Sequence, residues 1–65
     1  MKINYDEKTD SLSITFKSND KIVESDEAKP GIISDYNQAG ELVSMEILDA
    51  SKHISEAKKI EFQTV

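Results

Sequence analysis

The sequence contains no cysteine and no arginine, and it has a single histidine. Without cysteine, neither a disulfide nor a thiolate metal site can stabilise the fold, and the redox compartment stays undefined. One histidine also excludes the usual zinc sites, which use two or three histidine ligands. A domain of 65 residues has a thin margin of stability and usually needs a disulfide, a metal or oligomerisation to support it. Self-association is the support that the composition leaves most open.

Long apolar runs and basic clusters are absent as well. The opening "MKINYDEKTD" turns polar at once, and no apolar run approaches the roughly 20 residues that span a bilayer. The net charge of −5 argues against nucleic-acid binding, because phosphate neutralisation needs a basic face. We therefore expect a cytoplasmic protein without membrane contact. Its acidic surface either keeps it in solution or complements a basic protein partner.

What the sequence does contain, at its start, is a pair of short alternating segments. "INY" (3–5) and "SLSITFK" (11–17) predict two strands, with a polar loop between them. In the second segment Leu12, Ile14 and Phe16 alternate with polar residues, which is the period of a strand with one buried face.

A third extended segment begins with "IVES" (22–25). It runs into "DEAKPG" (26–31), where Pro30 cannot donate a hydrogen bond to a neighbouring strand. This interruption predicts a bend or an irregular sheet edge rather than a domain boundary.

"GIISDYNQAGELVSMEIL" is the clearest hairpin pattern. A three-residue loop "QAG" would place Gly40 in the left-handed conformation, which sets Ile33 opposite Met45 and Tyr36 opposite Leu42. Val43, Met45 and Ile47 then share one face with Ile33. A single helix covers only one face of a sheet, so apolar residues on the second face are candidates for an interface. They are Ile32, Tyr36, Leu42 and Leu48.

The period changes to that of a helix near the C-terminus. Ala50, Ile54 and Ala57 fall on one side of a helical wheel, which predicts a helix over about residues 50–59. The segment "IEFQTV" (60–65) predicts either a short extra strand or a frayed tail.

"DASKH", which holds an aspartate, a serine and the histidine, suggests a catalytic triad at first sight. Residues two apart on a helix point about 200° apart, so Ser51 would face away from both Asp49 and His53. We instead expect Asp49 to be the N-cap of the helix, with Ser51 as the alternative cap residue. His53 is expected at the boundary of the apolar stripe.

"DYNQAGELVSME" resembles the calcium-binding loop of an EF-hand in spacing. Asp35, Asn37 and Glu46 fall at its first, third and twelfth positions. Ala39 and Val43 occupy two other ligand positions, and the flanking segments alternate like strands rather than helices. The three residues are therefore weak candidates for a metal site, and we expect no cofactor and no metal.

Catalytic residues are not indicated. The acidic clusters "DEKTD" and "ESDE" could supply paired acids for hydrolysis, but clusters of this kind arise by chance in a chain this acidic. The sequence has no cysteine nucleophile and no glycine-rich phosphate loop, and a chain this short has little bulk to wall a deep pocket. We expect a protein that is not an enzyme.

Together these segments predict one α+β domain over residues 1–65. Its sheet would be an antiparallel meander of about four strands, with a C-terminal helix packed on one face and a possible extra strand at the C-terminus. The predicted core comprises Ile3, Tyr5, Leu12, Ile14, Phe16, Ile33, Val43, Met45, Ile47, Ile54 and Ala57.

The segments "INYDEKTDSLSITF", "VES" and "GIISDYNQAGELVSMEILDASKHI" resemble the small prokaryotic domain-of-unknown-function family 2283, over roughly residues 3–54. Asn37 stands where the family commonly has Asp, and Ser44 stands where it commonly has Gly. Members of this family are often encoded beside a small toxin-like protein. The resemblance therefore implies a binding role of an antitoxin-like or inhibitory kind, and it supplies no catalytic residues.

We expect a non-enzymatic protein-binding module whose partner is a small basic protein encoded by a neighbouring gene. A homodimer is also expected, formed through the second sheet face or through exchange of the C-terminal segment, which includes Ile60 and Phe62. The alternative is a small calcium- or ligand-binding protein that uses the Asp35–Glu46 hairpin. A hydrolase based on the acidic loops is a third, minor alternative.

Overall fold

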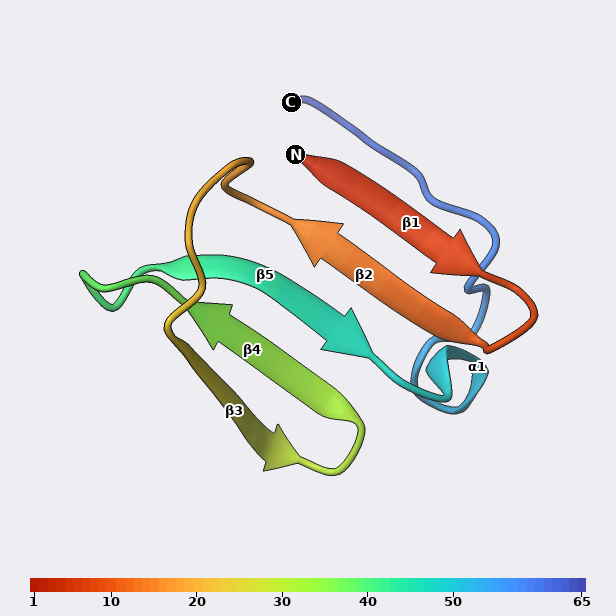
Figure 1. Cartoon of the computed structure of the whole chain (residues 1–65). Coiled ribbons are helices and arrows are strands. Elements are labelled where there is room, and N and C mark those ends of the chain that lie inside the picture. The colour runs from red at the N-terminus through yellow and green to blue at the C-terminus, as the bar shows by residue number, and fades with distance from the viewer.

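Five antiparallel strands and one helical turn form the structure, a computed structural model that describes residues 1–65 (Figure 1). The strands are β1 (Lys2–Asp6), β2 (Ser11–Thr15), β3 (Glu24–Lys29), β4 (Ile32–Tyr36) and β5 (Leu42–Ile47), and the helix is α1 (Ala50–His53). The fold is therefore largely β. The antiparallel sheet of the predicted α+β fold is present, but the predicted helix is reduced to a single turn. No helix is long and apolar enough to cross a membrane.

The strand order in the sheet is β1-β2-β5-β4-β3. β1 and β2 form one hairpin, β3 to β5 form a meander, and β5 joins the two units by pairing with β2 and β4. The segment 16–23 carries the chain from β2 to the far edge of the sheet, as Figure 1 shows. A simple four-strand meander was thus a wrong prediction, because β3 is a full strand and the last strand lies in the middle.

Pro30 and Gly31 form the turn between β3 and β4. Lys29 pairs with Ile32, and Gly31 has a φ of 81°, so the proline and glycine occupy the positions typical of a type II turn. The expected irregular edge is present, since β3 is an edge strand whose register shifts between Asp26 and Lys29. The bend expected at Pro30 is instead a tight hairpin turn.

The loop between β4 and β5 has the predicted form. Gly40 has a φ of 80°, and its amide donates to the Asn37 carbonyl at 3.0 Å. Tyr36 lies opposite Leu42 as expected. The register then shifts, because Val43 is an additional residue that leaves Asp35 opposite Ser44.

This bulge overturns the predicted pairing of Ile33 with Met45. Ile33 faces Glu46, and Ile32 faces Ile47. Because side chains alternate between faces, a shift of one residue exchanges the faces assigned to Ile32 and Ile33. Ile33 therefore lies outside the core to which the sequence assigned it.

The helix ends at His53, well short of the expected residue 59. Ile54 has extended backbone angles (φ −126°, ψ 126°), and the chain continues in a turn. Two alanines and one isoleucine give this segment little apolar surface to hold against the sheet, and short helices are marginal without such packing. The segment 60–65 forms no strand, and Phe62 is 82% exposed.

The hydrophobic core is small and lies at one end of the sheet. Leu12, Ala50 and Ala57 form its buried centre. The side chains packed around them are Ile3, Tyr5, Ile47 and Ile54. No large side chain is fully buried, and the molecule is a thin slab of 33 × 32 × 20 Å. Most of the sheet therefore lacks a second layer.

Candidate functional site

One face of the sheet is apolar, and the strand registers define its rows. Tyr5, Leu12, Ile47 and Ile32 form one row across β1, β2, β5 and β4. Ile3, Ile14, Met45 and Ser34 form the next row. A period of two places apolar side chains on one face of each strand, which is the pattern of an antiparallel sheet packed on one side only.

The helical segment covers only part of this face. Ala50, Ile54 and Ala57 pack over Leu12 and the first row. Besides Leu42 at the bulge, four further apolar side chains of this face lie outside that cluster and are only half-buried. They are Ile14, Ile32, Tyr36 and Met45, and we name them the open apolar patch. Phe16, next in the alternation after Ile14, is 41% exposed.

The opposite face is polar. Its rows across the strands are Asn4, Ser13, Glu46 and Ile33, and then Lys2, Thr15, Ser44, Asp35 and Ser25. Hydroxyl side chains dominate, and Ile33 is the one apolar member of these two rows. This face can therefore be hydrated or can form hydrogen bonds, but it has little apolar surface to bury.

Asp35 is the buried acid of the polar face. Only 4% of it is exposed, and its two carboxylate oxygens accept hydrogen bonds from the Ser25 hydroxyl at 2.6 Å and the Ser44 hydroxyl at 2.7 Å. Burial works to raise its pKa. The hydrogen bonds from Ser25 and Ser44, with a contribution from Glu46, more than offset burial and hold the pKa of Asp35 below its usual value.

Glu46 lies beside Asp35 and has the opposite shift. Partial loss of hydration raises the pKa of Glu46, and the negative charge of Asp35 raises it further. The two carboxyl groups therefore titrate as a coupled pair, in which Asp35 loses its proton first and Glu46 loses its proton at higher pH. Both oxygens of Asp35 already accept hydroxyl hydrogen bonds, so this carboxylate is engaged within the sheet.

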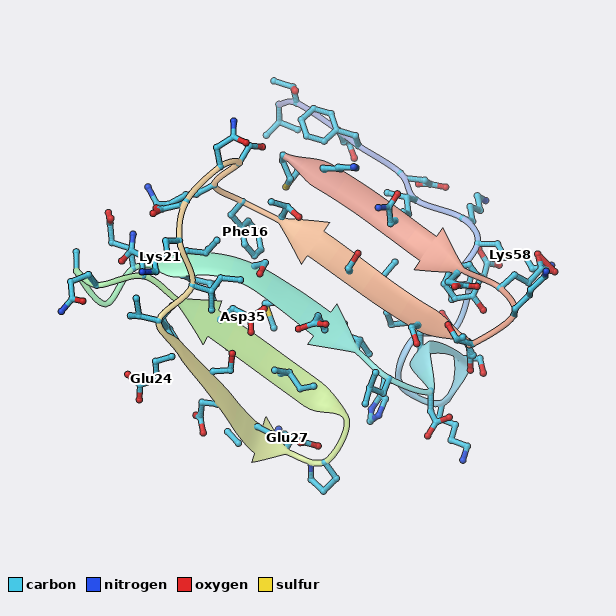
Figure 2. The ribbon with its side chains drawn as sticks, in the orientation of Figure 1. Phe16, Lys21, Glu24, Glu27, Asp35 and Lys58 are labelled. Atoms are coloured by element: carbon cyan, nitrogen blue, oxygen red, sulfur yellow. The ribbon has the colours of Figure 1, made fainter.

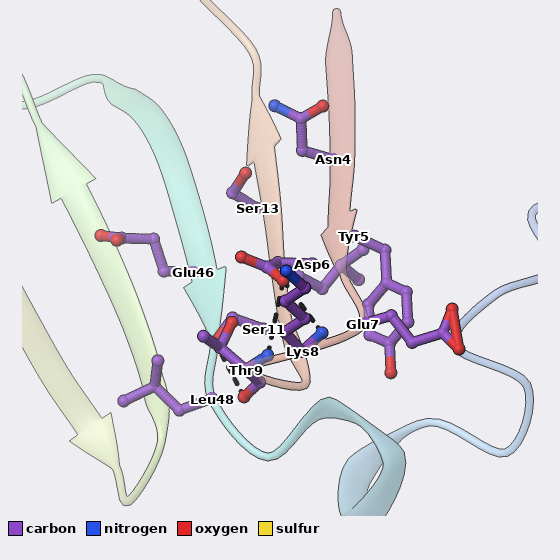
Figure 3. A pocket seen from close by; sticks show the side chains of 11 residues that line it. Asn4, Tyr5, Asp6, Glu7, Lys8, Thr9, Ser11, Ser13, Glu46 and Leu48 are labelled. Atoms are coloured by element: carbon purple, nitrogen blue, oxygen red, sulfur yellow. Dashed lines mark hydrogen bonds between the residues drawn. The ribbon is translucent and has the colours of Figure 1, made fainter.

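A shallow open depression of about 640 Å³ lies beside this pair, over β1, β2 and the end of β5 (Figure 3). Three neighbouring strands, β1, β2 and β5, each contribute a polar side chain to its lining, namely Asn4, Ser13 and Glu46 (Figure 3). At its far end Asp6 accepts hydrogen bonds from the amides of Lys8 and Thr9 and so shapes the β1–β2 turn. The walls are mostly polar, and no set of three or more His, Asp or Glu side chains here or elsewhere could hold a metal ion.

Asp10 connects the β1–β2 turn to α1. Its carboxylate accepts hydrogen bonds from the Tyr5 hydroxyl at 2.7 Å, the Ser51 hydroxyl at 2.6 Å and the Ser51 amide. These bonds lower the pKa of Asp10, those from Ser51 most strongly. The hydrogen bond to Asp10, together with burial, raises the pKa of Tyr5 to about 12.

The expected cap residues are corrected by this arrangement. Asp49 occupies the N-cap position with left-handed backbone angles, but its side chain makes no cap hydrogen bond. Asp10 caps the helix instead, and Ser51 donates to it. Asp10 is distant in the sequence, so no local pattern indicated its role. The Ser51 hydroxyl is directed to Asp10, and His53 lies near Gly31, so "DASKH" forms no nucleophile–base pair.

The edge strand β3 is acidic and fully exposed. All six of its residues are exposed, and one side of the strand faces no other strand. Figure 2 shows Glu24 outside this edge and Glu27 beside the β3–β4 turn, where it accepts a hydrogen bond from the Gly31 amide. The ion pairs of the chain involve Lys17, Lys58 and Lys59 and lie elsewhere, so Glu24 and Asp26 have no cationic partner.

The predicted interface residues do not form one surface. Ile32, Tyr36 and Leu42, which lies opposite Tyr36, share the apolar face that α1 partly covers, whereas Leu48 lines the depression on the polar side. Ile60 and Phe62 are exposed in the tail, at 54% and 82%. Leu48, Ile60 and Phe62 lie apart because they follow the end of β5 and belong to no strand.

Only two of the three weak metal candidates lie together. Asp35 and Glu46 are neighbours, but the Asn37 side chain donates to Asp20 at 2.9 Å and to Glu41 at 3.0 Å. Asn37 therefore closes the β4–β5 loop and joins it to the segment between β2 and β3. Its hydrogen bond and the charge of Lys17 lower the pKa of Glu41.

The fold and these surfaces define a small acidic β-sheet domain whose apolar face is only partly covered and whose acidic edge is open. The chain belongs to the family described as "Protein of unknown function (DUF2283)", whose model matches residues 2–51. This match confirms the resemblance noted in the sequence, and it ends within α1, before the tail. No curated protein and no solved structure matches the chain.

Proposed function

We propose that the chain is a non-enzymatic protein-binding module that takes a small basic protein on the outer edge of β3, in an antitoxin-like or inhibitory role. The single observation that supports this proposal is the edge strand itself. It combines a run of exposed backbone with Glu24, Asp26 and Glu27. An exposed sheet edge can pair with an extended segment of another protein through main-chain hydrogen bonds.

Charge selects the partner in this proposal. The chain has a net charge of −5, and neither Glu24 nor Asp26 is neutralised within it. A strand that carries lysine or arginine would pair with β3 without like-charge repulsion, and long-range attraction would speed the encounter. The same acidic side chains oppose pairing of two β3 edges with each other.

The test is a titration of the chain with the purified product of the neighbouring gene, at low and high salt. Glu24→Lys combined with Asp26→Lys should weaken binding by at least about tenfold, because two attractions become repulsions at the edge. Glu56→Lys combined with Glu61→Lys is the matched control, since it makes the same change in net charge away from the sheet edge. Binding that weakens equally in both variants would contradict β3 as the site. A neighbour that does not bind, together with a deletion that never exposes toxicity, would refute the function.

Calcium binding is the second candidate, because Asp35 and Glu46 do lie together. Calcium takes six to eight oxygen ligands, whereas Asp35 is occupied by two serine hydroxyls and Asn37 is engaged in the loop. Calorimetric titration with calcium chloride should therefore give no heat. A measurable heat that disappears in Glu46→Gln would favour the calcium site over the protein-binding function.

A further inference from the structure

The open apolar patch is the largest unexplained feature of the fold. Ile14, Met45, Ile32 and Tyr36 lie on the face that should carry the core, yet they are not part of the cluster in which the helical segment packs over Leu12. The missing cover is a consequence of length, because the helical segment is only four residues long. In a single copy of the chain, these four side chains are only half-buried.

The exposed area of the chain is too large for a compact monomer. A compact protein of 7.3 kDa is expected to expose about 4,200 Å², whereas this chain exposes 5139 Å². Part of this excess of about 1,000 Å² comes from the tail, where Phe62 is 82% and Val65 111% exposed. The remainder is available to an interface, to which each partner contributes roughly 800 Å² at standard size. The radius of gyration leads to the same conclusion, at 12.5 Å against about 10.7 Å for a compact chain of this length.

The small core requires the cover to be present whenever the chain is folded. Only Leu12, Val43, Ala50 and Ala57 are buried apolar residues, and the chain has no disulfide to compensate. A second copy of the chain is present whenever the chain is made, and it carries the same half-covered patch. Obligate dimers of this kind often have no stable folded monomer.

We infer that a second copy of this chain covers the open apolar patch, in a two-fold dimer with the apolar faces of the two sheets against each other. In this arrangement Met45 and Ile14 are buried at the interface, and the helical segments lie in the layer between the sheets. An interface of this type is self-complementary, because the same patch lies on both sides.

The polar face is excluded as the dimer surface by its chemistry. Ser13, Thr15 and Ser44 and the Asp35–Glu46 pair would lose water without gaining partners of matching geometry. The outer backbone edge of β3 is not part of this face, although Glu24 and Asp26 lie opposite Tyr36 and Ser34 at its margin. The two proposals can fail separately, because the dimer is tested with the chain alone and the proposed function with the product of the neighbouring gene.

The first test measures thermal unfolding and sedimentation of the unmodified chain over a wide concentration range. A dimer that holds the fold together should give an unfolding temperature that rises with protein concentration. Sedimentation should show a species of twice the chain mass that persists on dilution until the chain unfolds. A monomer at every concentration, with an unfolding temperature that does not change, would overturn the inference.

The second test locates the surface with single cysteines, which the chain otherwise lacks. Met45→Cys lies in the open apolar patch, and Ser13→Cys lies on the polar face of the adjacent strand. The labelling rate of the thiol in Met45→Cys should fall several-fold as concentration rises, whereas that in Ser13→Cys should stay constant. Protection of Ser13→Cys instead, or of neither, would refute the assignment of the surface even if a dimer forms.

Discussion

At the scale of single residues, the neighbouring acids Asp35 and Glu46 have opposite effects on stability. The pKa of Glu46 is raised in the fold, so its contribution to stability is present below its unfolded pKa and is lost as pH rises through its folded value. The pKa of Asp35 is lowered, so its contribution is present above its unfolded pKa and is lost as pH falls through its folded value. At neutral pH, the hydrogen-bonded Asp35 stabilises the sheet, whereas the negative charge of ionised Glu46 is repelled by the charge of Asp35.

This difference predicts two acid-to-amide changes of opposite sign. Glu46→Gln should raise the unfolding temperature at pH 7 by a few degrees, because it removes the repulsion and keeps a donor toward Asp35. Its advantage should shrink as the pH falls through the raised pKa of Glu46, where the wild-type side chain becomes neutral as well. Asp35→Asn should lower the unfolding temperature at pH 7, because Ser25 and Ser44 lose a charged acceptor. Calorimetry at the two pH values measures both effects, and the same sign for both variants at pH 7 would contradict the assigned pair.

Asp10 gives a second prediction at this scale. Replacing it by Asn removes the negative charge beside the Tyr5 hydroxyl, so the pKa of Tyr5 should fall from about 12 toward the ordinary tyrosine value. Ultraviolet absorbance titration of Asp10→Asn in a Tyr36→Phe background would follow Tyr5 alone. Ser51→Ala is the control, because it removes one donor from Asp10 and leaves the Tyr5 hydrogen bond in place. An unchanged pKa of Tyr5 in Asp10→Asn would show that the hydrogen bond to Asp10 does not raise it.

At the scale of elements, the two glycine turns differ in what surrounds them. Gly31 and Gly40 both have positive φ, which costs an L-residue about 1 kcal/mol. A Cβ at Gly31 would also lie 3.3 Å from the Leu48 carbonyl oxygen and 3.4 Å from His53, whereas nothing lies within 4 Å of Gly40. Gly31→Ala should therefore destabilise more than Gly40→Ala in chemical denaturation. Equal losses would mean that the backbone conformation alone sets the cost.

The strands were predictable because their signals are local. The alternation around Leu12 and Ile14 gave β2, and Gly40 gave the loop of the β4–β5 hairpin with its Tyr36–Leu42 pair. The Val43 bulge could not be predicted, because one additional residue leaves the alternation of Val43, Met45 and Ile47 unchanged. Its effect is visible only in the pairing with β4. For that reason the sequence assigned Ile32 to the wrong face of the sheet and did not predict where the open apolar patch lies.

The helix and its cap were harder to predict. The wheel pattern of Ala50, Ile54 and Ala57 predicts which residues face the sheet, and all three do pack there. It does not predict that the backbone leaves the helix at Ile54, because that depends on how much apolar area the sheet offers. The Asp10 cap is a contact between distant parts of the chain, which a single sequence does not reveal.

At the scale of the whole molecule, the tail is expected to be dispensable for folding. Residues 60–65 form no strand, and the side chains of Ile60 and Phe62 are mostly in water. Removing these six residues should leave the unfolding temperature unchanged within about 2 °C, which calorimetry would measure. The loss of the lone Lys59–Glu61 ion pair is negligible at the surface. A large fall in unfolding temperature, accompanied by dissociation of the dimer, would instead show that the tail is exchanged between copies.

The central position of β5 has a consequence for how the chain folds. The β1–β2 hairpin and the β3–β4–β5 meander each depend on contacts between near neighbours in the sequence, and only the pairing of β2 with β5 joins them. We expect that long-range step to close last and to limit the folding rate. A cut in the exposed segment between Lys17 and Ile22 should therefore give two fragments that are unfolded apart and assemble when mixed, with a rate that depends on their concentration. The last strand synthesised thus completes the fold.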